Sequence, residues 1–123
     1  MKGKTILIVE DDERNIFALT AVLKSKEPVI HTAKDGIECL QKLRTLSHID
    51  LVLLDMMMPR MDGYETLREI RKDEILKNTL VISLTAQAMK GDKEKCLEAG
   101  ANDYCSKPID INILIHKMVK LLV

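Results

Sequence analysis

The sequence lacks the features of several large classes of protein. Its 19 Lys and Arg residues are balanced by 19 Asp and Glu residues, so no net field would draw the chain onto nucleic acid or an anionic membrane. No apolar run is long enough to span a bilayer, and acidic residues come too early in MKGKTILIVEDD for a signal peptide. We therefore expect a cytoplasmic protein that binds neither nucleic acid directly nor a membrane.

Structural metal sites and disulfides are also not indicated. The three cysteines are odd in number and lack C-x-x-C spacing, and the three histidines are scattered singly. The chain contains no linker, no low-complexity tract and no internal repeat. Its 123 residues are enough for one hydrophobic core. We expect a single domain, residues 1–123, with one functional site.

Apolar runs alternate with helical patterns along the chain. Runs rich in β-branched residues occur at 6–9, 29–33, 51–54 and 80–84, with a weaker one at 103–106. The runs are apolar throughout, which indicates strands covered on both faces. The pattern therefore predicts an α/β fold, an open parallel sheet with right-handed crossovers and helices on each side.

Several residues mark the ends of the predicted helices. Asp35 and Asp62 are each followed three residues later by glutamate, the spacing of a capping box, and Gly100 is suited to a helix C-terminus. The last helix has apolar residues at the i, i+3, i+4, i+7 spacing of one buried face, beginning at Ile111.

Polar residues stand where the predicted strands end. Open parallel sheets place their ligand sites beyond the carboxyl ends of the strands. The residues at these ends are Glu10, Asp11 and Asp12 after the first strand, Asp55 at the third, Thr85 and Ala86 at the fourth, and Ser106, Lys107 and Pro108 at the fifth.

Each of these residues, taken alone, has an ordinary explanation. Asp11 or Asp12 could cap the helix that begins near Glu13, Thr85 is a common strand residue, and Lys107 could be a solvated charge. Independent coincidence would rarely place acids, a hydroxyl and an ammonium group at one edge of a sheet. The joint pattern favours a functional site.

The clustered carboxylates constrain the ligand. Two unit charges about 4 Å apart repel by roughly 4 kcal/mol at an effective dielectric of about 20, so Asp11, Asp12 and Asp55 require protonation or a cation. Mg²⁺ suits a sparse set of oxygen ligands that is completed by water and phosphate. With Thr85 and Lys107 nearby, an aspartate could act as nucleophile and become an acyl phosphate.

The same motifs resemble the receiver domain of two-component response regulators. The matching segments are ILIVEDD, LLDMMMPRMDG, ISLTA and AGANDYCSKP, and together they extend over nearly the whole chain. The resemblance implies a flavodoxin-like (βα)₅ fold with strand order 2-1-3-4-5. It also implies a protein that is not an enzyme in the usual sense, but a phosphoacceptor that assists its own phosphorylation and dephosphorylation.

The resemblance assigns a role to each site residue. Asp55 is implied to be phosphorylated by a histidine kinase in a Mg²⁺-dependent reaction. The implied metal ligands are Asp11 (through water), Asp12, Asp55 and the backbone carbonyl of Met57. The implied phosphoryl-binding residues are Thr85, Ala86 and Lys107, with a cis peptide bond before Pro108 that aims the lysine inward. Met57 and Gln87 lie two residues beyond Asp55 and Thr85, at positions that influence the water that attacks the phosphoryl group during dephosphorylation. Because Met57 is apolar and orients this water poorly, we predict a long phosphoryl lifetime.

The resemblance further implies a switch and a set of partners. Thr85 would move towards the phosphoryl group, and Tyr104 would turn into the vacated space and remodel the surface formed by the fourth helix, the fifth strand and the fifth helix. The implied partners are a histidine kinase or phosphotransfer protein and a downstream effector, and a phosphorylation-dependent dimer is compatible with this switch.

Other interpretations have less support. A receiver cut from a hybrid histidine kinase or a longer regulator fits the sequence equally well, and a vestigial receiver-like interaction domain would not need the intact set of site residues. Haloacid-dehalogenase-like phosphatases would need an aspartate where Met57 stands. A nucleotide-binding module would need a glycine-rich loop after the first strand, where VEDDER stands instead.

Overall fold

A computed structural model describes residues 1–46, 48–86 and 91–123, and its described strands form one parallel sheet. The strands are β1 (Thr5–Val9), β2 (Val29–Ala33), β3 (Leu51–Asp55), β4 (Val81–Thr85) and β5 (Asp103–Ser106). The helices are α1 (Glu13–Leu23), the short 3₁₀ helix η1 (Lys24–Lys26), α2 (Gly36–Thr45), α3 (Gly63–Lys72), α4 (Asp92–Ala99) and α5 (Ile111–Leu122). The strand order is β2-β1-β3-β4-β5, which confirms the predicted fold, including the weakly indicated fifth strand.

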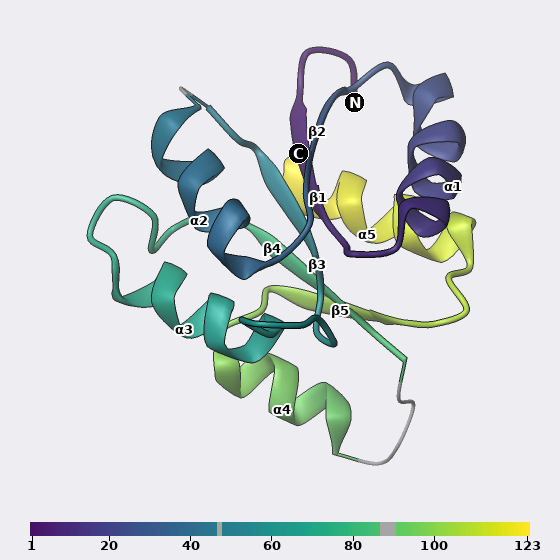
Figure 1. Ribbon diagram of the computed structural model, residues 1–123. Coiled ribbons are helices and arrows are strands. Elements are labelled where there is room, and N and C mark those ends of the chain that lie inside the picture. Colours follow the sequence, from purple (N-terminus) through teal and green to yellow (C-terminus); the bar gives the residue numbers. More distant parts are fainter. Residues whose placement is uncertain (47, 87–90) are drawn as a thin grey trace.

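Helices cover both faces of the sheet, as the uniformly apolar strands predict. Figure 1 shows α1 and α5 on one face and α2, α3 and α4 on the other. Every residue of β3 and β4 is buried. Alternate residues of β1 belong to two separate cores: Ile6 and Ile8 pack with α1 and α5, whereas Leu7 and Val9 pack with α2, α3 and α4. The central strands are therefore fixed from both sides.

The predicted helix ends are also confirmed. The Asp35 carboxylate accepts the Glu38 N–H at 2.9 Å at the start of α2, and Asp62 accepts the Glu65 N–H at 2.9 Å at the start of α3. Gly100 ends α4 with a φ of 115°, a left-handed conformation that favours glycine.

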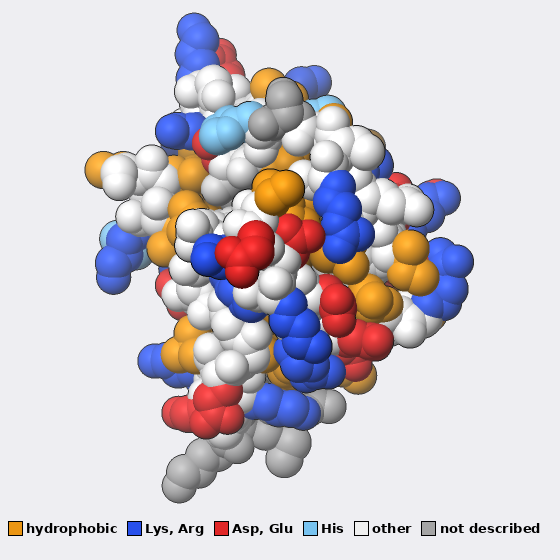
Figure 2. Space-filling model, turned by 90° about the vertical axis from the view of Figure 1, so that its left-hand side faces the viewer, with side chains coloured by type: hydrophobic (Ala, Val, Ile, Leu, Met, Phe, Trp, Pro, Cys, Tyr) orange, Lys and Arg blue, Asp and Glu red, His pale blue; other side chains and the backbone are white. Residues whose placement is uncertain are grey.

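Charged side chains of both signs are mixed on one face of the molecule. On the face that Figure 2 shows, Lys and Arg alternate with Asp and Glu, and hydrophobic side chains form only small groups between them. Within the described part of the chain, no helix has both the length and the apolar character needed to cross a membrane.

Candidate functional site

The parallel ladder carries the predicted site residues to one edge of the sheet. Hydrogen bonds continue beyond the strand ends: Glu10 N–H donates to Ala33 O at 2.9 Å, Met56 N–H to Leu84 O at 3.0 Å, and Lys107 N–H to Thr85 O at 2.7 Å. Because the strands run in the same direction, the residues that follow them lie side by side. The sheet therefore brings Glu10, Asp55 and Lys107 together.

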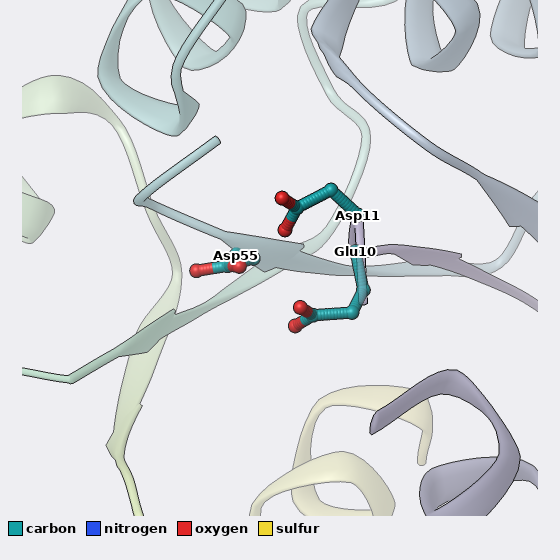
Figure 3. A group of neighbouring side chains, drawn as sticks. All are labelled: Glu10, Asp11 and Asp55. Atoms are coloured by element: carbon teal, nitrogen blue, oxygen red, sulfur yellow. The ribbon is translucent and has the colours of Figure 1, made fainter. Parts of the chain in front are cut away.

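Three carboxylates form the centre of this edge. One oxygen from each of Glu10, Asp11 and Asp55 lies within 4.8 Å of the others. Figure 3 shows Glu10 and Asp11 reaching from the end of β1 towards Asp55 at the end of β3. Glu10 and Asp55 are buried, whereas Asp11 is exposed, so the group is open to solvent on one side. Such a set of hard oxygen donors fits Mg²⁺, which keeps part of its water shell.

The ammonium group of Lys107 lies beside the two buried acids. Its Nζ is 3.2 Å from Glu10 Oε2 and 3.4 Å from Asp55 Oδ2. Burial lowers the pKa of Lys107, but attraction to Asp55 and Glu10 outweighs this effect and raises the pKa above its ordinary value. Lys107 is therefore a permanent cation at neutral pH.

Glu10 itself has a perturbed acidity. Burial raises the pKa of its carboxyl group, repulsion from Asp55 adds to the shift, and Lys107 opposes both. Two acids and one lysine leave the site with an excess of negative charge, and the exposed Asp11 adds to it. A cation would relieve this repulsion.

Asp12, which the resemblance implied as a metal ligand, is not a member of the acidic group formed by Glu10, Asp11 and Asp55. Its carboxylate caps α1, accepting the Arg14 N–H at 2.9 Å, and its Oδ2 lies 3.4 Å from the Arg14 guanidinium. The Arg14 backbone hydrogen bond, reinforced by the guanidinium, lowers the pKa of Asp12. In this structure Asp12 has the capping role that the sequence left open, and Glu10 takes its place among the clustered acids.

Sequence analysis could have found Glu10 from the alternation of β1. Side chains point to opposite faces in turn, so Ile6, Ile8 and Glu10 share one face and the next residue, Asp11, belongs to the other. The Glu10 N–H still bonds to β2, so this residue continues the strand geometry, whereas Asp12 already accepts a helical hydrogen bond from Ile16. The end of β1 therefore places the Glu10 side chain in the acidic group, whereas Asp12 belongs to the start of α1.

The remaining predicted residues surround Asp55. The Met57 N–H donates to Asp55 Oδ1 at 3.0 Å, and Met57 as a residue is 58% exposed. Thr85 is buried at the end of β4, and Ala86 follows it on the surface. The peptide bond between Lys107 and Pro108 is cis, as predicted. Gln87, the other position predicted to influence water, lies outside the described residues.

Tyr104 is half-buried between β4, α4 and α5. The Tyr104 carbonyl accepts a hydrogen bond from the Lys117 ammonium group at 2.5 Å, and Lys117 Nζ lies 4.6 Å from the centre of the Tyr104 ring. Lys93 of α4 lies 5.9 Å from the same ring. Across the ladder from Tyr104 is Ser83, whose buried hydroxyl has no hydrogen-bond partner among the residues that the structure describes. The aromatic side chain thus contacts cations of both helices on the predicted switch surface.

Comparison with known proteins links this geometry to one family. The family model of the response regulator receiver domain matches residues 6–119. The polar-differentiation response regulator DivK of Brucella ovis is 35% identical, and the aligned region covers 97% of this chain and 96% of that protein. Hybrid signal transduction histidine kinase D of Dictyostelium discoideum is 36% identical over 98% of this chain, which spans only 8% of that much longer kinase.

One similar solved structure contains a metal ion. The receiver domain of a sensor histidine kinase from Pseudomonas aeruginosa PAO1 is 36% identical, with a TM-score of 0.88 and 98% coverage of both chains. That structure holds a magnesium ion coordinated in its active-site cleft.

Proposed function

The chain belongs to the response regulator receiver domain family of two-component systems, and on this basis we propose that Asp55 accepts a phosphoryl group from a histidine kinase or phosphotransfer protein. The observation that carries the proposal is the placement of Asp55. It is buried at a strand end, with one oxygen 3.4 Å from Lys107 Nζ and the other accepting the Met57 N–H. Both contacts hold the carboxylate at the edge of the sheet.

The reaction uses Asp55 as a nucleophile. One carboxylate oxygen forms a bond to phosphorus while the bond between phosphorus and the donor breaks, and the electron pair leaves with the donor's imidazole nitrogen. Lys107, already cationic, is placed to neutralise phosphoryl oxygens, and Thr85 and Ala86 are the groups that would bind the transferred phosphoryl.

We assign the metal site to Glu10, Asp11, Asp55 and the backbone carbonyl of Met57. A bound Mg²⁺ would neutralise charge on the phosphoryl oxygens during transfer. Before transfer, the three carboxylates provide the negative potential that attracts the cation, and the solvent-exposed Asp11 leaves room for its water ligands.

The output of the domain follows from the modification. Phosphorylation replaces the Asp55 carboxylate with a group of roughly −1.5 to −2 charge that bears three acceptor oxygens beside Thr85 and Lys107. We propose that Thr85 and Tyr104 respond and alter the α4-β5-α5 surface, which then binds a downstream effector or a second copy of the domain. Residues 1–123 would form one receiver domain, acting alone or within a longer protein.

Intact mass measurement with a small phosphodonor tests the central claim. Incubation with Mg²⁺ and acetyl phosphate should add one phosphoryl group to the wild type and to Asp62→Asn, in which asparagine preserves the exposed helix cap. Asp55→Asn should remain unmodified. An unmodified wild type, or an undiminished adduct on Asp55→Asn, would refute the proposal.

A further inference from the structure

The loop between β3 and α3, residues 56–62, carries a backbone N–H that contacts Asp55, and hydrogen bonds hold both of its ends. At the start, the Met57 N–H donates to the Asp55 carboxylate at 3.0 Å. At the end, the Gly63 N–H donates to Met56 O at 3.2 Å, and a Cβ on Gly63 would lie 2.5 Å from Met56 Cα. The loop therefore closes tightly on itself beside the site.

The middle of this loop contains an unfavourable backbone conformation. Arg60 has a φ of 65°, in the left-handed region that residues with a Cβ seldom occupy. The Met61 N–H donates to Pro59 O at 2.8 Å, which makes a three-residue turn centred on Arg60. A conformation of this kind persists only where surrounding contacts maintain it.

The Arg60 side chain forms an ion pair with Asp35. The Arg60 guanidinium donates to Asp35 Oδ2, and Asp35 Oδ1 accepts the Glu38 N–H at the start of α2. The Asp35 side chain is 2% exposed and the Arg60 side chain 70%, so the guanidinium lies on the solvent side of the carboxylate. Asp35 is fixed by the helix it caps, and Arg60 therefore anchors the loop to α2.

We propose that the Arg60–Asp35 ion pair is a positioning device for the phosphorylation site. It holds the β3–α3 loop so that the Met57 N–H keeps the Asp55 carboxylate oriented and the Met57 carbonyl stays available to the metal. Arg60 touches neither group and acts through the loop. The inference deepens the function proposed above, since it depends on Asp55 and Met57 having the roles assigned there.

Mg²⁺ titration by calorimetry gives a readout that does not depend on phosphorylation. Arg60→Gly removes the ion pair while glycine tolerates the positive φ, so any loss reflects the missing anchor and not added backbone strain. We expect Mg²⁺ to bind about tenfold more weakly, the low end of the cost of losing a group that orients a metal ligand. Asp35→Asn, which preserves the cap of α2, should weaken Mg²⁺ binding similarly, and Arg60→Lys should restore part of the affinity.

Two controls separate positioning from general structural support. Arg44→Ala breaks a different ion pair, to Asp73 at 3.5 Å, and should leave Mg²⁺ affinity unchanged. In the Asp35→Asn background, Arg60→Gly should have no further effect, because the two residues act as a pair. Wild-type Mg²⁺ affinity in Arg60→Gly, with or without a change in the denaturant midpoint, would overturn the inference. Failure of the wild type to bind Mg²⁺ or to be phosphorylated would instead overturn the proposed function.

Discussion

At the scale of single residues, the ammonium group of Lys107 is held between two buried carboxylates. Replacing it with the apolar Met removes the partner of Glu10 and Asp55 at once. We expect the metal-free Lys107→Met protein to lose roughly 2 kcal/mol of unfolding free energy, less than for a fully buried pair because the lysine is 25% exposed. Denaturant unfolding without Mg²⁺ measures this loss.

The same variant should bind Mg²⁺ more tightly, because a competing positive charge is gone. We expect at least about a tenfold gain in affinity, together with phosphorylation by acetyl phosphate slowed about 100-fold as the cation that neutralises phosphoryl oxygens disappears. Weaker Mg²⁺ binding in Lys107→Met would contradict the electrostatic balance described for this site.

Met57 provides a second prediction at this scale. Its exposed thioether side chain offers poor hydrogen bonding to a water that attacks the phosphoryl group. Met57→Asn should accelerate dephosphorylation roughly threefold or more, because an amide can orient that water. Decay of the phosphorylated mass in Mg²⁺ buffer measures the rate, and Met57→Leu, which is equally apolar, should decay like the wild type. Equal lifetimes for the Asn and Leu variants would count against a role for this side chain.

Ser83 provides a third prediction, because its buried hydroxyl has no hydrogen-bond partner within residues 1–46, 48–86 and 91–123. Ser83→Ala should raise the free energy of unfolding by about 1 kcal/mol, since alanine removes a desolvated polar group from the core. Thr66→Val is the matched control, because the Thr66 hydroxyl is equally buried but donates to Asp62 O at 2.7 Å. Denaturation curves should move in opposite directions for the two variants, and a shared direction would show that the Ser83 hydroxyl is satisfied in solution.

At the scale of elements, the junction of β1 and α1 decides which acid lies beside Asp55 in the proposed metal site. Because Asp12 caps α1 and Glu10 continues β1, Glu10→Gln should weaken Mg²⁺ binding by roughly tenfold or more, whereas Asp12→Ala should change it less than about twofold. Asp12→Ala should instead lower the denaturant midpoint through the lost cap. The reverse pattern of Mg²⁺ affinities would restore Asp12 as the ligand.

This junction also shows what sequence analysis could and could not reach. Strand positions, the caps at Asp35 and Asp62 and the convergence of strand ends were predictable, because they depend on local patterns and on the geometry of parallel sheets. The sequence analysis named Asp11 and Asp12, whereas the structure places Glu10 and Asp11 beside Asp55, because a difference of one residue in where the strand stops and the helix starts decides which side chain enters the site.

The ion pair between Arg60 and Asp35 could not be predicted from the sequence. The residues are separated by 25 positions, and neither local periodicity nor the site motif relates them. Moreover, Arg60 occupies a left-handed conformation that residue preferences argue against. Ion pairs between residues far apart in the sequence form only when the helices and the sheet have packed together. The burial of the Ser83 hydroxyl also results from this tertiary packing.

At the scale of the whole molecule, the proposed metal site links Mg²⁺ binding to folding stability. A ligand that binds only the folded state raises the free energy of unfolding by about 2.7 kcal/mol at 100 times its dissociation constant. Because the three carboxylates that we propose as ligands come from the ends of two strands, they assemble only in the folded sheet. The unfolding midpoint should therefore rise with Mg²⁺ concentration.

The pH dependence of this effect follows from Glu10. Burial and the neighbouring Asp55 raise the pKa of Glu10 in the folded protein above its unfolded value of 4.5. Protonation of Glu10 therefore stabilises the folded state, fully at pH values below 4.5, and this stabilisation is lost as pH rises through the folded pKa. Mg²⁺ needs the deprotonated carboxylate. The stabilisation by Mg²⁺ should consequently be full at neutral pH and shrink as pH falls through the folded pKa of Glu10.

Unfolding curves with and without Mg²⁺ from pH 4 to 8 measure this stabilisation. In Glu10→Gln the remaining Mg²⁺ effect should vary less over the mildly acidic range, and an unaltered pH profile in that variant would show that another group controls metal binding.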